Sequence, residues 1–211
     1  TPRGASRFDF FSSLDRDVRF FARASDAATR ALSAVRSHRL LRTLSLSLVS
    51  KPTDTTVHAR STHPWSPADC VWLDSMAGYH FPAVFVRCKR GPATRTVVHC
   101  HANACDVGHI YELCQRDAEC WRANVLLVEY PGYGASPGVS YERSVDRHVM
   151  VAYNYLVEDL RCAPESVVLF GRSLGSGPVC RLALRLQELG EKVGGVILHS
   201  PFVSVREVGL A

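Results

Sequence analysis

Long apolar runs are absent from this 211-residue sequence, and it does not open with the basic, apolar and small-residue succession of a secretory signal. The first absence argues against a membrane-spanning helix, and the second argues against a cleaved leader. The sequence therefore predicts a cytoplasmic protein. Any contact with membranes is expected to be peripheral and on their cytosolic face.

Paired cysteine motifs are also absent, although the chain has eight cysteines, the first of them Cys70. Scattered cysteines without Cys-x-x-Cys spacing argue against a secreted disulfide framework and predict mostly buried free thiols. The densest group of metal-ligand types is His99, Cys100, His101, Cys105 and His109. Because adjacent strand residues point to opposite faces, His99 and Cys100 cannot face one ion, and we expect no metal.

Glycine patterns that cradle nucleotides are missing as well. Residues 132–137 read Gly-Tyr-Gly-Ala-Ser-Pro, which differs from G-x-G-x-x-G, and no Lys follows the glycines of residues 171–177 as a P-loop requires. We therefore expect no cofactor and no nucleic-acid partner.

Positive charge is concentrated at the start of the chain. Residues 1–51 contain ten Arg and Lys against four Asp, a net charge of +6, so the remainder is close to neutral, because the whole sequence has a net charge of +5. Apolar residues at three- and four-residue spacing predict that residues 12–49 are helical. They are Leu14, Val18, Phe21, Ala28, Leu32 and Val35.

Residues 51–54, Lys-Pro-Thr-Asp, end this pattern, so we place a basic amphipathic extension at 1–55 and a second domain at 56–211. The extension is expected either to bind anionic membrane surfaces through residues 1–51 or to pack on the core of the second domain.

Strand-like and helix-like segments alternate from residue 70 onward. Strands are predicted at 70–74, 81–88, 95–101, 124–130, 166–170 and 193–199, and helices at 107–121, 141–160 and 174–189. Continuous apolar runs such as Val-Val-Leu-Phe at 167–170 are typical of strands covered on both faces. The alternation predicts an α/β fold with a mostly parallel sheet, helices on both faces and an antiparallel hairpin at its start.

Ser173 has the setting of a catalytic nucleophile. It follows a buried strand, precedes a helix and lies between Gly171 and Gly175 in the sequence Gly-Arg-Ser-Leu-Gly. This tight strand-to-helix turn exposes a serine hydroxyl at the helix N-terminus, and glycines are needed where the strand and the helix nearly touch. Acyl transfer also needs an oxyanion hole, for which Leu174 offers one backbone N–H and Asn103 or Ala102 the other.

Five segments together resemble a known family. They are residues 85–88 (Phe-Val-Arg-Cys), 101–108 (His-Ala-Asn-Ala-Cys-Asp-Val-Gly), 130–136 (Tyr-Pro-Gly-Tyr-Gly-Ala-Ser), 171–177 and 197–201 (Ile-Leu-His-Ser-Pro). The chain over residues 70–205 resembles the α/β-hydrolase-domain-17 type of protein depalmitoylases, and related serine peptidase-like hydrolases share several of these segments. The resemblance implies an α/β-hydrolase fold and hydrolysis of thioester-linked acyl chains on membrane-associated proteins by a Ser–Asp–His triad. It assigns Ser173 as the nucleophile and gives the oxyanion-hole role to Asn103 and Leu174.

Two departures from the family stand out. Ala102 occupies a position that is usually Gly, which restricts the oxyanion loop. No Cys precedes Cys70, whereas animal members of the family have an N-terminal cysteine cluster that anchors them. The basic N-terminal segment is therefore the better candidate for membrane contact here.

The triad acid and histidine are expected to lie outside this chain. In this fold the order is Ser, acid, His, yet after Ser173 the only histidine is His199 and the only carboxylates are Glu188, Glu191 and Glu207. Glu188 and Glu191 come at the far end of a helix, roughly 20 Å from the serine at 1.5 Å per residue. We therefore expect an α/β-hydrolase domain whose C-terminal part is missing.

The residues leave several functions open. The preferred one is an ester or thioester hydrolase acting on an S-acylated protein, a thioesterase; a carboxylesterase or lipase and a serine peptidase are alternatives. A non-enzyme alternative is an inactive fragment or pseudoenzyme that binds membranes or partners. Asp106 and Glu129 precede Ser173 and are interpreted as a helix cap and a structural carboxylate, while Asp146 and His148 are expected to be solvated or supporting.

Overall fold

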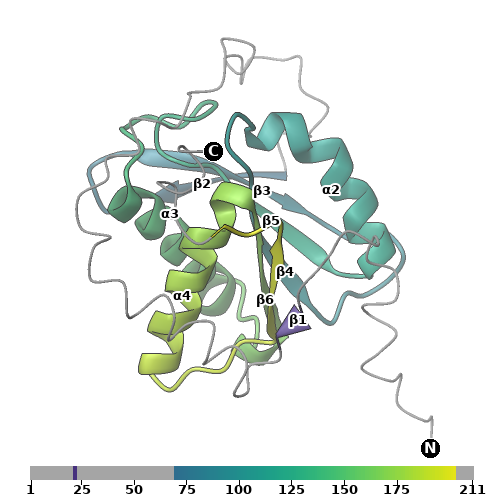
Figure 1. Cartoon of the computed structure of the whole chain (residues 1–211). Coiled ribbons are helices and arrows are strands. Elements are labelled where there is room, and N and C mark those ends of the chain that lie inside the picture. Colours follow the sequence, from purple (N-terminus) through teal and green to yellow (C-terminus); the bar gives the residue numbers. More distant parts are fainter. Residues whose placement is uncertain (1–20, 23–68, 203–211) are drawn as a thin grey trace, which may run out of the picture.

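A seven-stranded sheet with the strand order β1-β7-β6-β4-β5-β3-β2 is the centre of the computed structural model, which describes residues 21–22 and 69–202 (Figure 1). The strands are β1 (Phe21–Ala22), β2 (Cys70–Asp74), β3 (His80–Val86), β4 (Thr96–Cys100), β5 (Asn124–Val128), β6 (Val167–Arg172) and β7 (Gly195–His199). The α-helices are α2 (Val107–Trp121), α3 (Glu142–Asn154) and α4 (Ser176–Glu188).

The expected hairpin is formed by β2 and β3, which pair antiparallel. Gly78 adopts a positive φ of 82° in the turn between them, a conformation that glycine adopts without steric cost. Ser75 stabilises the turn, since its backbone N–H and its hydroxyl both donate to the Tyr79 carbonyl, at 2.9 and 2.5 Å.

The four strands that alternate with helices form the parallel part of the sheet. β4 lies in the middle and pairs in parallel with β5 on one side and with β6 on the other, and β6 pairs in parallel with β7. All five residues of β4 are buried, because helices cover both faces here. The predicted mostly parallel sheet is confirmed.

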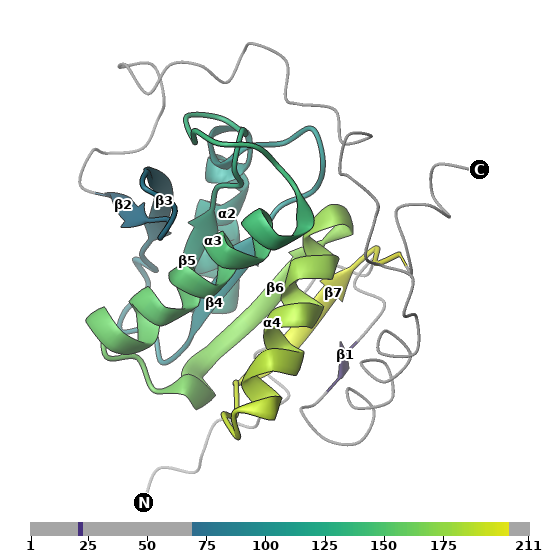
Figure 2. The same ribbon diagram turned by 90° about the vertical axis from the view of Figure 1, so that its left-hand side faces the viewer.

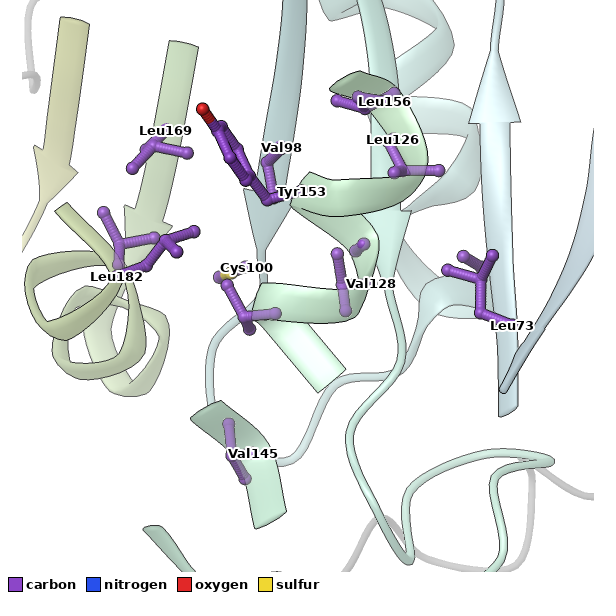
Figure 3. Close-up of a cluster of buried hydrophobic side chains, with 14 of the residues drawn as sticks. Leu73, Val98, Cys100, Leu126, Val128, Val145, Tyr153, Leu156, Leu169 and Leu182 are labelled. Atoms are coloured by element: carbon purple, nitrogen blue, oxygen red, sulfur yellow. The ribbon is translucent and has the colours of Figure 1, made fainter. Parts of the chain in front are cut away.

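Helices lie on both faces of the sheet, with α2 on one side and α3 and α4 together on the other (Figures 1 and 2). Each face has its own apolar cluster. The cluster under α3 and α4 includes Val98 and Cys100 of β4, Leu169 of β6 and Leu182 of α4 (Figure 3). The cluster under α2 contains Val97 of β4 and alternate residues of the neighbouring strands, as the two-residue period of a strand requires.

The helix predicted at 141–160 ends earlier than expected. α3 stops at Asn154 and continues as one π-helical turn, Tyr155–Asp159, in which the Leu160 N–H donates to the Tyr155 carbonyl at 3.0 Å. Arg161 then adopts a left-handed φ of 57° and ends the helical segment. Apolar spacing alone does not distinguish this wider last turn from regular helix.

β1 corrects the N-terminal prediction at two residues. Phe21 and Ala22 fall inside the range 12–49 expected to be helical, but they form a strand that pairs antiparallel with Ile197 and Val196 of β7. The edge of β7 offers unpaired backbone groups, and a short strand satisfies them whatever its side-chain periodicity. The rest of the predicted extension lies outside the described residues, and so do the residues around the boundary at 55 and 56.

Among the helices that the structure describes, none is both long and apolar enough to cross a bilayer.

Candidate active site

Ser173 lies at the sharp turn between β6 and α4. β6 ends at Arg172, residues Ser173–Gly175 form a 3-10 turn, and α4 begins at Ser176. Ser173 has a φ of 47°, in the left-handed region that non-glycine residues seldom adopt, and it is half-buried. The Ser176 hydroxyl donates to the Ser173 carbonyl at 2.5 Å and so stabilises this backbone.

Gly171 and Gly175 allow the turn to be this tight. A Cβ on Gly171 would lie 2.8 Å from the Cα of Ser176, and a Cβ on Gly175 would lie 2.6 Å from the carbonyl carbon of Cys100, closer than the 3.0 Å that real Cβ atoms respect. The first close approach lies between β6 and the start of α4, and the second lies between the turn and the end of β4. The spacing of the two glycines around Ser173 thus has the steric role that the sequence suggested.

The loop after β4 begins at the same place. Cys100, which contacts Gly175, is the last residue of β4, and residues 101–106 lead from it to α2. Ala104 in this loop has a left-handed φ of 56°, and Asp106 caps α2 by accepting from the His109 N–H at 2.9 Å. The predicted role of Asp106 as a helix cap is therefore confirmed.

Asn103 and Leu174 come from these two neighbouring loops. β4 and β6 lie side by side with Cys100 opposite Gly171, and the chain leaves β4 toward α2 on one face and β6 toward α4 on the other. Ligands of α/β sheets bind at such a switch in direction, at the carboxyl ends of the strands. Asn103, Leu174 and Ser173 thus belong to one edge of the sheet, and each is half-buried.

Two tyrosines hold the loop after β4. The Tyr130 hydroxyl donates to the His101 carbonyl and the Tyr133 hydroxyl donates to Asn103 Oδ1, both at 2.9 Å. The rings of His101 and Tyr130 stack with centroids 4.0 Å apart. Burial raises the pKa of both tyrosines, so both hydroxyls stay protonated and able to donate.

Glu129 is a structural carboxylate, as its position before Ser173 suggested. It is completely buried at the end of β5, and its Oε1 lies 3.0 Å from His101 Nε2. Its oxygens also accept from the backbone N–H groups of Tyr130 and Val107, both at 3.2 Å. Spacing in the sequence did not reveal the pairing with His101, because the two residues are 28 positions apart.

His148 and Asp146 support the fold from α3. His148 is fully buried against Phe81, which corrects the alternative that it is solvated. Its place could have been found from the helical spacing of the buried residues Val145, Val149 and Ala152, which share its face. Asp146 accepts from Arg181 Nε at 2.7 and 2.8 Å and so joins α3 to α4, yet burial raises the pKa of this carboxyl.

Among residues 69–202, no hydrogen bond joins the Ser173 hydroxyl to a carboxylate or a histidine that could complete a triad. His199 lies at the end of β7, opposite Arg172 in register, and no hydrogen bond joins it to Ser173 within the described part of the chain. Glu188 ends α4 at the far side of the sheet, and Glu191 accepts from Tyr153 at 2.8 Å. Glu207 lies outside the described residues.

The cysteines and histidines near β4 do not gather around one point. Cys100 belongs to the cluster under α3 and α4, whereas His99 stacks on Phe170 on the other face at 4.6 Å. Within residues 69–202 no group of three or more His, Cys, Asp or Glu side chains is arranged to hold a metal ion. All eight cysteines are free, but only Cys100 and Cys114 are fully buried, so burial is less complete than the sequence suggested.

Comparisons with known proteins agree with this architecture. No protein-family model matches the sequence. Alpha/beta hydrolase domain-containing protein 17B of Homo sapiens is 30% identical over 136 residues, which are 64% of this chain and 45% of that protein. Alpha/beta hydrolase domain-containing protein 17C of Xenopus tropicalis is 32% identical over 121 residues, which are 57% of this chain and 37% of that protein. The chain thus spans less than half the length of these curated relatives.

Solved structures agree on the fold. The structure of EstE5 soaked with p-nitrophenyl butyrate matches 85% of this chain and 59% of its own with a TM-score of 0.53 and 16% identity. A bacterial heroin esterase matches 63% of this chain and 44% of its own with a TM-score of 0.53 and 18% identity. The chain therefore has an α/β-hydrolase fold, and its sequence resembles the α/β-hydrolase-domain-17 proteins.

Proposed function

We propose that the protein is a serine hydrolase that cleaves an ester or thioester through an acyl-serine intermediate on Ser173. One observation supports this most strongly: Ser173 has a left-handed backbone in a turn so tight that Gly175 touches the end of β4. Such strain at a half-buried serine before a helix is typical of a nucleophile held in place by its surroundings.

In the proposed reaction Ser173 Oγ attacks the acyl carbonyl carbon and forms a new C–O bond. The negative charge that develops on the carbonyl oxygen is stabilised by the backbone N–H groups of Leu174 and Asn103. The bond to the leaving alcohol or thiol then breaks, and the leaving group takes the proton that a general base removed from Oγ. Water then attacks the acyl-serine in the same way. The base removes a proton from water, the acyl–oxygen bond to Ser173 breaks, and Ser173 Oγ regains its proton as the carboxylic acid leaves.

The proposal places the base and its partner acid outside the described residues, because within them no histidine hydrogen-bonds Ser173. For the substrate we propose a thioester-linked acyl chain on a protein, and this choice rests on the resemblance to the domain-17 relatives. A carboxylesterase, lipase or peptidase would use the same Ser173, Leu174 and Asn103 groups, and an inactive binding module would use none of them.

Labelling with a fluorophosphonate probe tests the enzyme class. In the full-length protein, Ser173→Ala should abolish both labelling and hydrolysis of an acyl thioester, because the substitution removes the attacking oxygen. Ser166→Ala is the matched control, since Ser166 lies just before the opposite end of β6 and its hydroxyl donates to the Ala163 carbonyl. Labelling that persists in Ser173→Ala would show that the proposed nucleophile is wrong.

A further inference from the structure

His101 and Glu129 form a buried polar pair at the carboxyl ends of β4 and β5. His101 is 1% exposed and Glu129 is 0% exposed, and the distance from Nε2 to Oε1 is 3.0 Å. Burying such a pair is costly, and apolar residues of similar size often stabilise a fold at least as well. The pair therefore calls for an explanation beyond stability.

The hydrogen bonds of His101 determine where one of its protons lies. Nδ1 is 2.9 Å from the Ala102 carbonyl oxygen, which can only accept, so Nδ1 bears a hydrogen. Nε2 faces the carboxylate of Glu129. The ring is thus held at both nitrogens, and Glu129 is itself held by the Val107 and Tyr130 N–H groups.

The Ala102 carbonyl and the Asn103 N–H belong to the same peptide unit. No cis peptide bond occurs in the described residues, and in a planar trans unit the C=O and the N–H point in opposite directions. A hydrogen bond that holds the Ala102 carbonyl toward His101 therefore turns the Asn103 N–H away from His101. Glu129 fixes the ring, the ring fixes the carbonyl, and the carbonyl fixes the direction of the N–H.

We propose that the buried Glu129–His101 pair positions the peptide between Ala102 and Asn103 so that the Asn103 N–H is aimed at the developing oxyanion. This inference rests on the proposed function, since it concerns the oxyanion hole of that reaction. Glu129 and His101 are positioning residues, because they act through the peptide and not on the substrate. The Tyr133 hydroxyl donates to the side chain of Asn103 and so holds this residue at a second point.

Two variants that share one substitution separate positioning from stability. In Glu129→Gln, the amide can donate to His101 Nε2 while Nδ1–H still donates to the Ala102 carbonyl, so the peptide stays aimed. In the double variant Glu129→Gln with His101→Phe, the aromatic ring can still stack on Tyr130 but the bond to Ala102 is lost. The two variants differ only at residue 101.

We expect Glu129→Gln to keep kcat for an acyl ester within about threefold of the wild-type value. We expect the double variant to lose about 10- to 100-fold in kcat with little change in KM, because an oxyanion donor acts mainly in the transition state. Thermal unfolding of both variants checks that the fold persists. Equal kcat in two folded variants, with Ser173→Ala inactive, would overturn the positioning role, whereas hydrolysis by Ser173→Ala would overturn the proposed function instead.

Nitrogen-15 NMR of the histidine side chains gives a second measurement that needs no folded double variant. In the wild-type protein Nδ1 of His101 should bear a hydrogen, as its bond to the Ala102 carbonyl requires. A bare Nδ1 would overturn the proposal.

Discussion

Three buried histidines near the carboxyl edge of the sheet have different hydrogen-bond partners. Nδ1 of His99 has no hydrogen-bond partner among the described residues, and burial, with a smaller contribution from His101, lowers the pKa of His99 to about 3. His148 Nδ1 lies 2.8 Å from the Glu129 carbonyl oxygen, and its Nε2 lies 3.1 Å from the Tyr79 hydroxyl. His148 can satisfy both contacts as a neutral ring, with Nδ1–H donating and Nε2 accepting.

His148 should make the protein less stable in acid. Burial lowers its pKa from 6.5 to about 4, so between these pH values the unfolded state binds a proton that the folded state excludes. The contribution of neutral His148 is fully present above pH 6.5 and is lost as the pH falls to 4, a change of roughly 3 kcal/mol. The measurement is the free energy of unfolding by denaturant at pH 7 and at pH 4.5, for the wild type and for His148→Phe.

The phenylalanine variant should be less stable than the wild type at pH 7, because two hydrogen bonds are lost while the stack on Phe81 remains. The difference between the two proteins should shrink or reverse at pH 4.5, since phenylalanine does not titrate. The comparison cancels the other titrating groups. A difference that is the same at both pH values would contradict the account of His148.

The contact of the turn with β4 joins three elements at the scale of secondary structure. Gly175 lies between β6 and α4 and touches the backbone of Cys100, so its lack of a side chain sets how closely α4 approaches the middle of the sheet. In the proposed reaction, the carboxyl ends of β4 and β6 must stay adjacent so that the N–H groups of Asn103 and Leu174 can face one oxyanion. The geometry of the site therefore depends on this one close approach.

Gly175→Ala should destabilise the fold by about 1–3 kcal/mol and also lower activity, because the added Cβ forces the turn away from β4. Gly195→Ala in β7 is the matched control, since a Cβ there meets nothing within 4 Å and the backbone has no positive φ. That variant should unfold at the wild-type denaturant concentration or slightly above it. The two midpoints of unfolding check the prediction, and similar values for both alanine variants would show that the contact with Cys100 is not limiting.

Much of the element pattern could be predicted from the sequence because it depends on local periodicity. The helix at 107–121 has the expected bounds, and so has the first hairpin strand at 70–74. The Gly-Arg-Ser-Leu-Gly turn could also be predicted, because a local backbone geometry requires its glycines. Contacts between residues that depend on the strand order could not be predicted from the sequence. β4 lies between β5 and β6, which brings Glu129 to His101 and Gly175 to Cys100.

At the scale of the whole molecule, the described fold does not account for the uneven distribution of charge along the chain. Residues 1–51 have ten Arg and Lys against four Asp, while the rest of the chain is close to neutral. Two residues of this segment, Phe21 and Ala22, pair with β7 of the sheet that bears Ser173. We propose that residues 1–51 bind anionic membrane surfaces and so bring the sheet that bears Ser173 to the membrane.

Neutralising part of this charge should weaken binding to anionic vesicles. Replacing Arg16, Arg19 and Arg23 by Gln lowers the net charge of the segment from +6 to +3 and keeps its apolar residues. Deleting the segment is a less specific change, because it would also remove the partner of β7 and expose a sheet edge. Each basic residue near such a membrane contributes about 1 kcal/mol, so the triple variant should bind at least tenfold more weakly to vesicles of phosphatidylserine and phosphatidylcholine.

Sedimentation with these vesicles at low and high salt measures the effect, with pure phosphatidylcholine vesicles as the control. Because the attraction is screened by salt, wild-type binding should fall toward that of the variant as salt rises. Binding that is equal in the two proteins at every salt concentration would leave the alternative, that the segment packs on the hydrolase core and has no membrane role.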